Sequence, residues 1–248
     1  MRALVVSDIH GNAAALRAVL GVPHDLVLCL GDIVGYGPYP GACVEIIREQ
    51  ATLCVQGNHD RAFGAGVPPG ASARFQGLAA ATTPIANAQL SDEDRRYLRE
   101  LPRWGFIRLA GRQFMAVHAT PRDPLYEYLG PDRDAWIERA RTMSTDVLLV
   151  GHTHLQFRID AGDRVIVNPG SLGQPKDGDP RAAYAVIDDG NVTLHRIAYD
   201  VEATVQALLA SPVPAAAGTA LAALLRTGRV AAMDAHVDTA PVPAVGAP

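Results

Sequence analysis

Histidine, aspartate and asparagine gather in short clusters along this chain. Five of its eight histidines lie in four such clusters, and a further cluster contributes an aspartate alone. Each cluster follows an apolar run that is typical of a β-strand. Imidazole nitrogens with carboxylate and amide oxygens are ligands of divalent transition metals, so the clusters predict a metal site. The clusters are Asp8-Ile9-His10-Gly11-Asn12, Gly31-Asp32, Gly57-Asn58-His59-Asp60, His118 and Gly151-His152-Thr153-His154.

Both the spacing and the position of the clusters predict that their side chains converge. Residues two apart on an extended segment project to the same side, so the side chains of Asp8 and His10 could reach the same point in space. His152 and His154 have the same spacing. Ligand sites in open α/β sheets lie beyond the carboxyl ends of the strands. We therefore expect the clusters to meet in one crevice.

The composition of the ligand set favours two metal ions. It contains nitrogen and oxygen but no sulfur, which suits Mn²⁺, our first choice, or iron or Zn²⁺. Seven ligands are too many for one tetrahedral ion, and two ions would lie about 3.5 to 4 Å apart. Two dications at that spacing repel by roughly 16 kcal/mol at an effective dielectric of about 20, so Asp32 and a hydroxide are expected to bridge them.

The elements that must position these ligands change in character along the chain. Apolar runs at 3–7, 25–30 and 52–56 alternate with helical patterns at 13–20 and 42–50, which indicates parallel βαβαβ units. The second half is richer in turn signals between apolar runs, which predict antiparallel hairpins. One parallel sheet cannot hold these hairpins, so we expect an α/β fold of two facing mixed β-sheets flanked by helices. The turn signals are at 110–112, 161–163 and 188–191, and further helical patterns are at 71–101 and 132–143.

The end of the chain has a different composition. The stretch from Ala203 to Leu225 has no charge and could in principle cross a bilayer, but Pro212 and Pro214 interrupt it. We expect two short alanine-rich helices there and no membrane span. A single domain would cover 1–230, and 231–248, which is rich in Ala, Pro and Val, would be a mobile tail.

Overall composition excludes several classes of protein. With 48% hydrophobic and 19% charged residues, the 248-residue chain can bury a sizeable core. Its formal charge is −4 and its arginines are scattered, so we expect no nucleic-acid-binding surface. Lys176 is the only lysine, which we attribute to coding bias rather than to function. Three cysteines without a CxxC pair and a start unlike a secretory signal predict a cytoplasmic protein.

The order of the motifs resembles that of the calcineurin-like metallophosphoesterases. The run 32–38, Asp-Ile-Val-Gly-Tyr-Gly-Pro, resembles their small prokaryotic phosphodiesterase branch, and the resemblance covers roughly residues 1–200. It implies a four-layer αββα sandwich. An isolated histidine at a strand end is more often structural, but five motifs in family order outweigh that interpretation. The resemblance implies that one metal is held by Asp8, His10, Asp32 and His154, and the other by Asp32, Asn58, His118 and His152.

The resemblance also implies a reaction. A metal-bridging hydroxide would attack phosphorus in a phosphodiester while His59 assists the leaving group. Phosphoprotein phosphatases of the same superfamily have Asp-Arg where this chain has Gly35-Tyr36, so their phosphate-gripping arginine and histidine-orienting aspartate are both missing here. The sequence therefore does not assign the residue that orients His59, although Asp60 is its neighbour in the chain. Arg122 and Tyr36 are candidate substrate contacts, although each could equally have a structural role.

Several alternatives stay open. Within the enzymes they are dinucleoside polyphosphate hydrolysis and phosphomonoester hydrolysis. A protein-binding scaffold of the same fold is a third, but such scaffolds tend to lose the leaving-group histidine, and His59 is present. Ser171 does not fit the GxSxG pattern of a nucleophile and is expected to be a turn residue beside the site. The expected partner is a phosphate ester, with a nucleotide as one option, and a homo-oligomer is compatible with the sequence.

Overall fold

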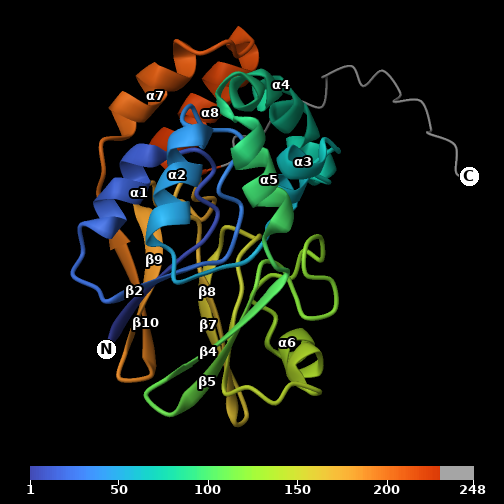
Figure 1. The fold of residues 1–248 in the computed structure, drawn as a ribbon, viewed down its shortest axis with the longest axis vertical. Helices are drawn as coiled ribbons and strands as arrows, with labels where there is room; N and C mark the ends of the chain where they lie inside the picture. Colours follow the sequence, from blue (N-terminus) through green and yellow to red (C-terminus); the bar gives the residue numbers. More distant parts are fainter. Residues whose placement is uncertain (230–248) are drawn as a thin grey trace, which may run out of the picture.

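Two five-stranded sheets form the centre of the molecule (Figure 1). The computed structural model describes residues 1–229, except for the side chains at positions 73 and 74. The first sheet contains, in spatial order, β10 (Asn191–Ile197), β9 (Ala182–Asp188), β1 (Arg2–Val6), β2 (Leu26–Cys29) and β3 (Leu53–Cys54). The second contains β4 (Trp104–Leu109), β5 (Arg112–Val117), β6 (Val147–Leu149), β8 (Arg164–Pro169) and β7 (Gln156–Ala161).

The strand directions confirm the two patterns expected from the sequence. β1, β2 and β3 are parallel and are connected by α1 (Ala13–Leu20) and α2 (Pro40–Gln50), as the βαβαβ pattern predicts. The hairpins β4–β5, β7–β8 and β9–β10 are antiparallel. β3 is shorter than the predicted apolar run at 52–56. At Gln56 the chain no longer pairs with β2, and its backbone N–H donates to the carbonyl of Pro102 instead.

The alternation of side chains along each strand creates the layers. In β1, Ala3 and Val5 belong to the core between the sheets, together with Phe114 of β5. Leu4 and Val6 point to the other face, where they pack with residues of α1 and α2. Successive side chains of a strand point to opposite faces, so a strand buried on both faces is apolar throughout. This explains the continuous apolar run at 3–6.

One helix covers the outer face of the second sheet. It is α6 (Arg133–Ala140), which lies within the predicted helical segment 132–143. Its Trp136 is fully buried in a cluster with Phe157 of β7. The complete order of layers is therefore helix, sheet, sheet, helix, which confirms the predicted α/β sandwich.

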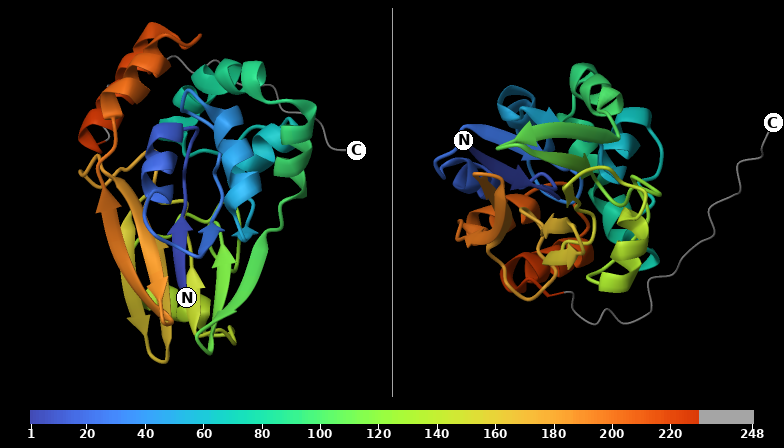
Figure 2. Two further views of the ribbon diagram at one scale, coloured as in Figure 1. Left: turned by 60° about the vertical axis from the view of Figure 1, so that its left-hand side comes forward. Right: turned by 90° about the horizontal axis from the view of Figure 1, so that it is seen from below.

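The remaining helices gather beyond one end of the sheets, as both Figure 1 and Figure 2 show. The predicted segment 71–101 forms α4 (Ala73–Gln89) and α5 (Asp92–Glu100), and Ser91 caps α5 by accepting a hydrogen bond from Asp94. α3 (Asn58–Ala65) precedes them. The stretch with Pro212 and Pro214 contains α7 (Val201–Leu209) and α8 (Ala215–Thr227), which pack on α1 and α4.

Within residues 1–229, no helix is both long and apolar enough to span a membrane. The predicted tail at 231–248 and His236 lie outside the described residues.

Candidate metal centre

The predicted ligands follow the carboxyl ends of five strands. Asp8 follows β1, Asp32 follows β2, Asn58 follows β3, His118 follows β5 and His152 follows β6. The first three strands belong to one sheet and the last two to the other. The site therefore lies where the ends of the two sheets meet, at the position expected for α/β sheets.

The backbone at the ligands differs from the extended conformation that we expected. Asp8, His10, Asp32, His152 and His154 all have positive φ angles, between 47° and 66°. Asp8 and His10 still converge, but through left-handed turns rather than strand geometry, whereas His152 and His154 belong to different ligand groups. The left-handed conformation costs a non-glycine residue roughly 1 to 2 kcal/mol, and such strain is concentrated at functional sites.

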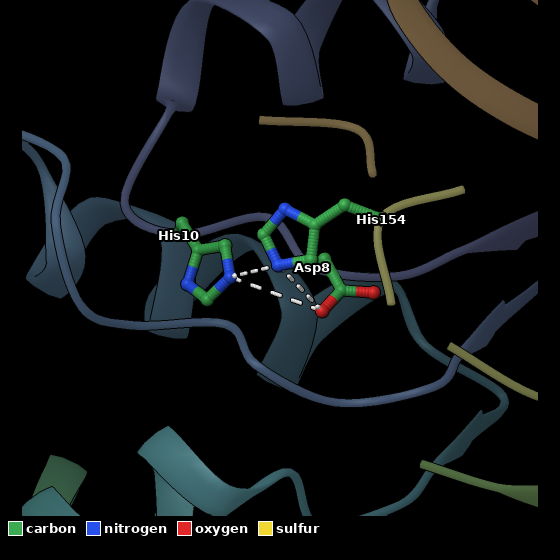
Figure 3. Close-up of side chains that lie close together, drawn as sticks. All are labelled: Asp8, His10 and His154. Atoms are coloured by element: carbon green, nitrogen blue, oxygen red, sulfur yellow. Dashed lines mark hydrogen bonds and ion pairs between the residues drawn. The ribbon is translucent and has the colours of Figure 1, made fainter. Parts of the chain in front are cut away.

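The first ligand group contains Asp8, His10 and His154 (Figure 3). The Nε2 atoms of the two histidines are 3.1 Å apart, and the Oδ1 atom of Asp8 is 3.3 Å from that of His154. The Nδ1 atoms of His10 and His154 donate to the carbonyls of Val34 and Gln174, at 3.1 and 2.6 Å. Burial lowers the pKa of both histidines well below its usual value, so the rings are neutral. Their Nε2 lone pairs then face each other, which is unfavourable unless a cation lies between them.

Asp8 supports the same conclusion. Its Oδ2 atom accepts hydrogen bonds from Ser7 and from the backbone N–H of His152, at 2.7 and 3.0 Å. Its Oδ1 atom is buried and has no hydrogen-bond partner among the described residues. Burial raises the pKa of Asp8 to about 6, because nothing compensates the desolvated charge fully. A buried carboxylate oxygen without a partner, aimed at two imidazole lone pairs, fits a metal ligand.

Asp32 connects the first group to a second one. Its Oδ2 atom is 3.8 Å from the Nε2 of His10 and 3.4 Å from the Nε2 of His118. Its Oδ1 atom accepts a hydrogen bond of 2.8 Å from the backbone N–H of His59. Burial alone would raise the pKa of Asp32, but the neighbouring His118 and His59 outweigh it and hold that pKa well below its usual value. Asp32 is therefore an ionised carboxylate between two sets of ligands.

The second group contains Asp32, His118 and His152, whose ligand atoms lie within 4.8 Å of one another. The Nδ1 of His118 donates to the carbonyl of Leu30 at 2.8 Å, and its Nε2 lies 3.1 Å from the Oδ1 of Asn58. The amide nitrogen of Asn58 donates to the carbonyl of Pro69, so its oxygen faces the site.

The protonation of His118 reflects the charge of this group. Burial disfavours the charged ring, but Asp32 outweighs it and raises the pKa of His118 to about 10. A divalent cation in contact with Asp32 would take over the neutralising role of that proton. The donor set of both groups thus fits two divalent ions that share Asp32.

His59 lies beside both groups, and one of its ring nitrogens is within 4.8 Å of ligand atoms of His10 and Asp32, so these three side chains form a third possible group. His59 is 4% exposed at the start of α3, and burial lowers its pKa to about 4. Its ring centroid is 5.0 Å from that of His10 and 4.8 Å from that of Tyr36. A Cβ atom at Gly35 would lie only 2.5 Å from its Nδ1. The ring therefore rests against the backbone of Gly35, at a position where an aspartate side chain has no room unless His59 moves.

Asp60 has a structural role rather than orienting His59. Its carboxylate accepts hydrogen bonds from the backbone N–H groups of Asp32, Ile33 and Gly57, at 2.7, 2.8 and 3.0 Å. It thereby joins the loop after β2 to the start of α3. No side-chain hydrogen bond to His59 is present among residues 1–229, so the packing of Tyr36 and Gly35 defines its position.

The two predicted substrate contacts differ in where they lie. Tyr36 is buried, packs edge-on against His10, and lines a pocket of about 120 Å³ that reaches Asp32 and His59. Arg122 is exposed and does not line that pocket.

Four further side chains that line the pocket were not predicted: Phe75, Tyr126, Tyr128 and Lys176. Only the pairing of tyrosines at positions 126 and 128 and the uniqueness of the lysine could have drawn attention to them. Ser171 lies in a turn beside the centre, as expected, and donates to the carbonyl of Asp8 at 2.8 Å.

Comparison with known proteins agrees with this geometry. The profile of the calcineurin-like phosphoesterase superfamily domain matches residues 1–191. An uncharacterised protein of Methanocaldococcus jannaschii is 32% identical over 234 residues, which cover 85% of this chain and 93% of that protein. The phosphodiesterase YfcE of Escherichia coli is 25% identical over 206 residues, covering 76% and 88%. The crystal structure of a metallophosphoesterase from Sphaerobacter thermophilus has a TM-score of 0.78 and 34% identity, covering 92% of this chain and 99% of that one.

This chain belongs to the calcineurin-like phosphoesterase superfamily. It is a metal-dependent hydrolase of phosphoric esters, as the family and the ligand groups together indicate.

Proposed function

We propose that this protein is a binuclear phosphodiesterase. The observation that carries the proposal is the position of Asp32, which belongs to the second ligand group and whose Oδ2 atom also lies 3.8 Å from the Nε2 of His10 in the first group. One ion would be held by Asp8, His10, Asp32 and His154, and the other by Asp32, Asn58, His118 and His152. Two divalent ions, when bound, supply an activated water nucleophile and neutralise charge on the phosphoryl oxygens.

His59 would act on the leaving group. Its lowered pKa keeps the ring neutral near pH 7, so one ring nitrogen carries a proton that can be donated in a hydrogen bond to the departing oxygen. It lines the same pocket as Asp32, within reach of a substrate placed against the centre. Because its ring is almost fully buried, the donor is held in one orientation.

A diester is favoured over a phosphoprotein by the residue at position 36. A tyrosine there removes the arginine that grips phosphate in phosphoprotein phosphatases. The relative YfcE, named a phosphodiesterase, supports the same choice. A nucleotide is the second substrate class that an observation favours, because the rings of Tyr36, Phe75, Tyr126 and Tyr128 all line the pocket. Aromatic side chains of this kind can stack on a base.

Mn²⁺ is our proposed metal, because the centre combines imidazole with carboxylate and amide oxygen and contains no thiolate. We also propose a cytoplasmic location. All three cysteines are free in the structure, which is consistent with a reducing compartment.

The decisive experiment combines elemental analysis with turnover of bis(p-nitrophenyl) phosphate by the Mn²⁺-loaded protein. We expect two ions per chain and metal-dependent release of p-nitrophenol. Asp32→Asn should lower the metal content and abolish turnover, because Asp32 is shared by both groups. Asp163→Asn, on the exposed β7–β8 hairpin, is the matched control and should behave as wild type.

A panel of nucleotides, cyclic nucleotides and dinucleoside polyphosphates then separates the substrate classes. Protein with two bound ions that hydrolyses no diester or nucleotide would contradict the proposal. In that case the scaffold alternative would be favoured if the protein also bound a partner stably.

A further inference from the structure

Lys176 has an environment that packing alone does not explain. It is the only lysine of the chain, it is half-buried, and its Nζ atom lies 4.0 Å from the centroid of the Phe75 ring. No carboxylate among residues 1–229 forms an ion pair with it. The lysine is thus a cation in a pocket wall that packs on one aromatic ring and forms no direct ion pair among the described residues.

The segment that carries Lys176 is fixed to the metal centre. The carbonyl of Gln174, two residues earlier, accepts the hydrogen bond from the Nδ1 of His154. The backbone N–H of Gln174 donates in turn to the hydroxyl of Ser171, which itself donates to the carbonyl of Asp8. The lysine therefore has a defined position relative to the centre.

The side chain of Lys176 points toward the reaction site. It lines the same pocket as Asp32 and His59. Burial lowers the pKa of Lys176 to about 8, while Asp8 and Asp32 attract its charge and oppose that effect. Once divalent ions bind these carboxylates, their charge is neutralised and the lysine loses this attraction. Two bound dications would repel the ammonium group of Lys176, and an anion in the pocket would offset this repulsion.

We propose that Lys176 is the anion-binding side chain of this site and contacts a non-bridging oxygen of the substrate's phosphoryl group. This inference rests on the proposed function for the identity of the substrate. In phosphoprotein phosphatases an arginine supplies the positive charge where this chain has Tyr36. Here Lys176, in the loop after β8, would supply that charge. The ring of Tyr36 packs on the rings of His10 and His59.

The test is binding of inorganic phosphate to the Mn²⁺-loaded protein, measured by isothermal titration calorimetry, with metal content determined for each variant. Lys176→Met keeps the aliphatic chain over Phe75 but removes the charge. We expect about tenfold weaker phosphate binding, the loss of one charge-assisted hydrogen bond, with two ions per chain retained. Lys176→Arg should retain most of the affinity. Arg141→Met, which removes an exposed cation at the end of α6 outside the pocket lining, is the matched control and should change affinity by less than about twofold.

Phosphate binding that is equal in Lys176→Met and wild type would overturn the assignment. So would loss of metal from Lys176→Met, because a side chain that contacts only the anion does not hold the ions. If Lys176→Arg bound phosphate as weakly as Lys176→Met, the positive charge of the side chain would not be what binds the anion, and the assignment would also fail. If phosphate binding depends on Lys176 but the wild type hydrolyses no diester, the inference stands and the proposed function fails.

Discussion

His59 differs from three of the four predicted histidine ligands in the surroundings of its ring. The Nδ1 atoms of His10, His118 and His154 donate to backbone carbonyls, whereas His59 has no such tether among residues 1–229. A ligand needs a fixed tautomer, which the carbonyl supplies. A proton donor needs a ring nitrogen that stays free for the substrate. The pattern agrees with the role proposed for His59 but does not by itself separate the two roles, because the ring of His152, also a predicted ligand, has no carbonyl partner among residues 1–229 either.

His59→Ala should lower kcat by about 10² to 10⁴, the usual cost of losing a general acid, while both ions are retained. The loss should be greater for an alkyl leaving group than for p-nitrophenolate, because a poor leaving group depends more on protonation. Steady-state kinetics with matched aryl and alkyl diesters checks this. An equal loss for both leaving groups would assign His59 to binding rather than to proton donation.

Gly35 is expected to matter through His59. A methyl group at this position would lie 2.5 Å from the His59 ring, and the residue has a φ of 93°. Gly35→Ala should therefore displace the ring and lower kcat by about tenfold or more, because misplacing a reacting group by about 1 Å can cost 10²-fold. Gly111→Ala is the control: Gly111 also has positive φ, 80°, but open space around its Cβ position. It should lose stability and keep its activity, and a similar loss of kcat in both variants would contradict the role of Gly35.

The loops that carry the ligands are held by a small number of buried polar groups. Asp60 is the central one, because its carboxylate accepts four hydrogen bonds from the backbone of the β2 loop and the start of α3. Its place in α3 matches that of Asp94 in α5, since each is the third residue of its helix and accepts a hydrogen bond from the N-cap backbone. The two aspartates thus share a capping role and differ in their distance from the metal centre.

Asp60→Asn should destabilise the metal-free protein by roughly 1 to 3 kcal/mol, because the amide nitrogen cannot accept the hydrogen bonds of the buried N–H groups. It should also weaken metal binding, since the backbone of Asp32 loses its support. Asp94→Asn should cost about 0.5 to 2 kcal/mol and leave metal affinity unchanged. Urea unfolding with chelator and titration with Mn²⁺ measure the two effects. Unchanged metal affinity in Asp60→Asn would show that the loop holds its shape without this carboxylate.

Most of the order of strands and helices was predictable because it depends on local pattern, although the helix α3 was not predicted. The apolar run at 3–6 and the turn residues at 110–112 and 188–191 define strands and hairpins without reference to distant residues. The left-handed conformation of Asp8 and His10 was not predictable, because it depends on backbone hydrogen bonds to the neighbouring loop, such as that from His10 to the carbonyl of Asp32.

The same distinction applies to the site. The proposed ligands sit in ordered motifs and could be selected from the sequence. Phe75, Tyr126 and Lys176 come from three separate parts of the chain and belong to no motif, so only the fold brings them into one pocket. Arg122 had the right charge and lies near a ligand in sequence, but its side chain is exposed.

The metal centre joins the two halves of the sandwich. Asp8 and Asp32 come from the first sheet, while His118 and His152 come from the second. Removing the ions should therefore lower the stability of the whole domain, because two carboxylates and facing imidazoles remain buried without a cation. At an ion concentration about 100 times the dissociation constant, each bound ion contributes about 2.7 kcal/mol.

We expect chelation to lower the Tm measured by calorimetry by roughly 10 to 20 °C, given two ions at about 2.7 kcal/mol each and about 2 to 4 °C per kcal/mol for a chain of this size. Addition of Mn²⁺ should restore it. In Asp32→Asn the chelator should have a much smaller effect, which serves as the control. A Tm that does not respond to chelation in the wild type would mean that the ions bind too weakly to support the two halves.

The division of ligands between the sheets also sets the order of events during maturation. Each proposed ion takes donors from both sides, and the final donor, His154, is made only after more than half of the chain has been synthesised. Neither half can therefore form a complete coordination sphere alone. We expect the polypeptide to collapse and pack first and to acquire its ions afterwards, so that cofactor uptake completes assembly rather than starting it.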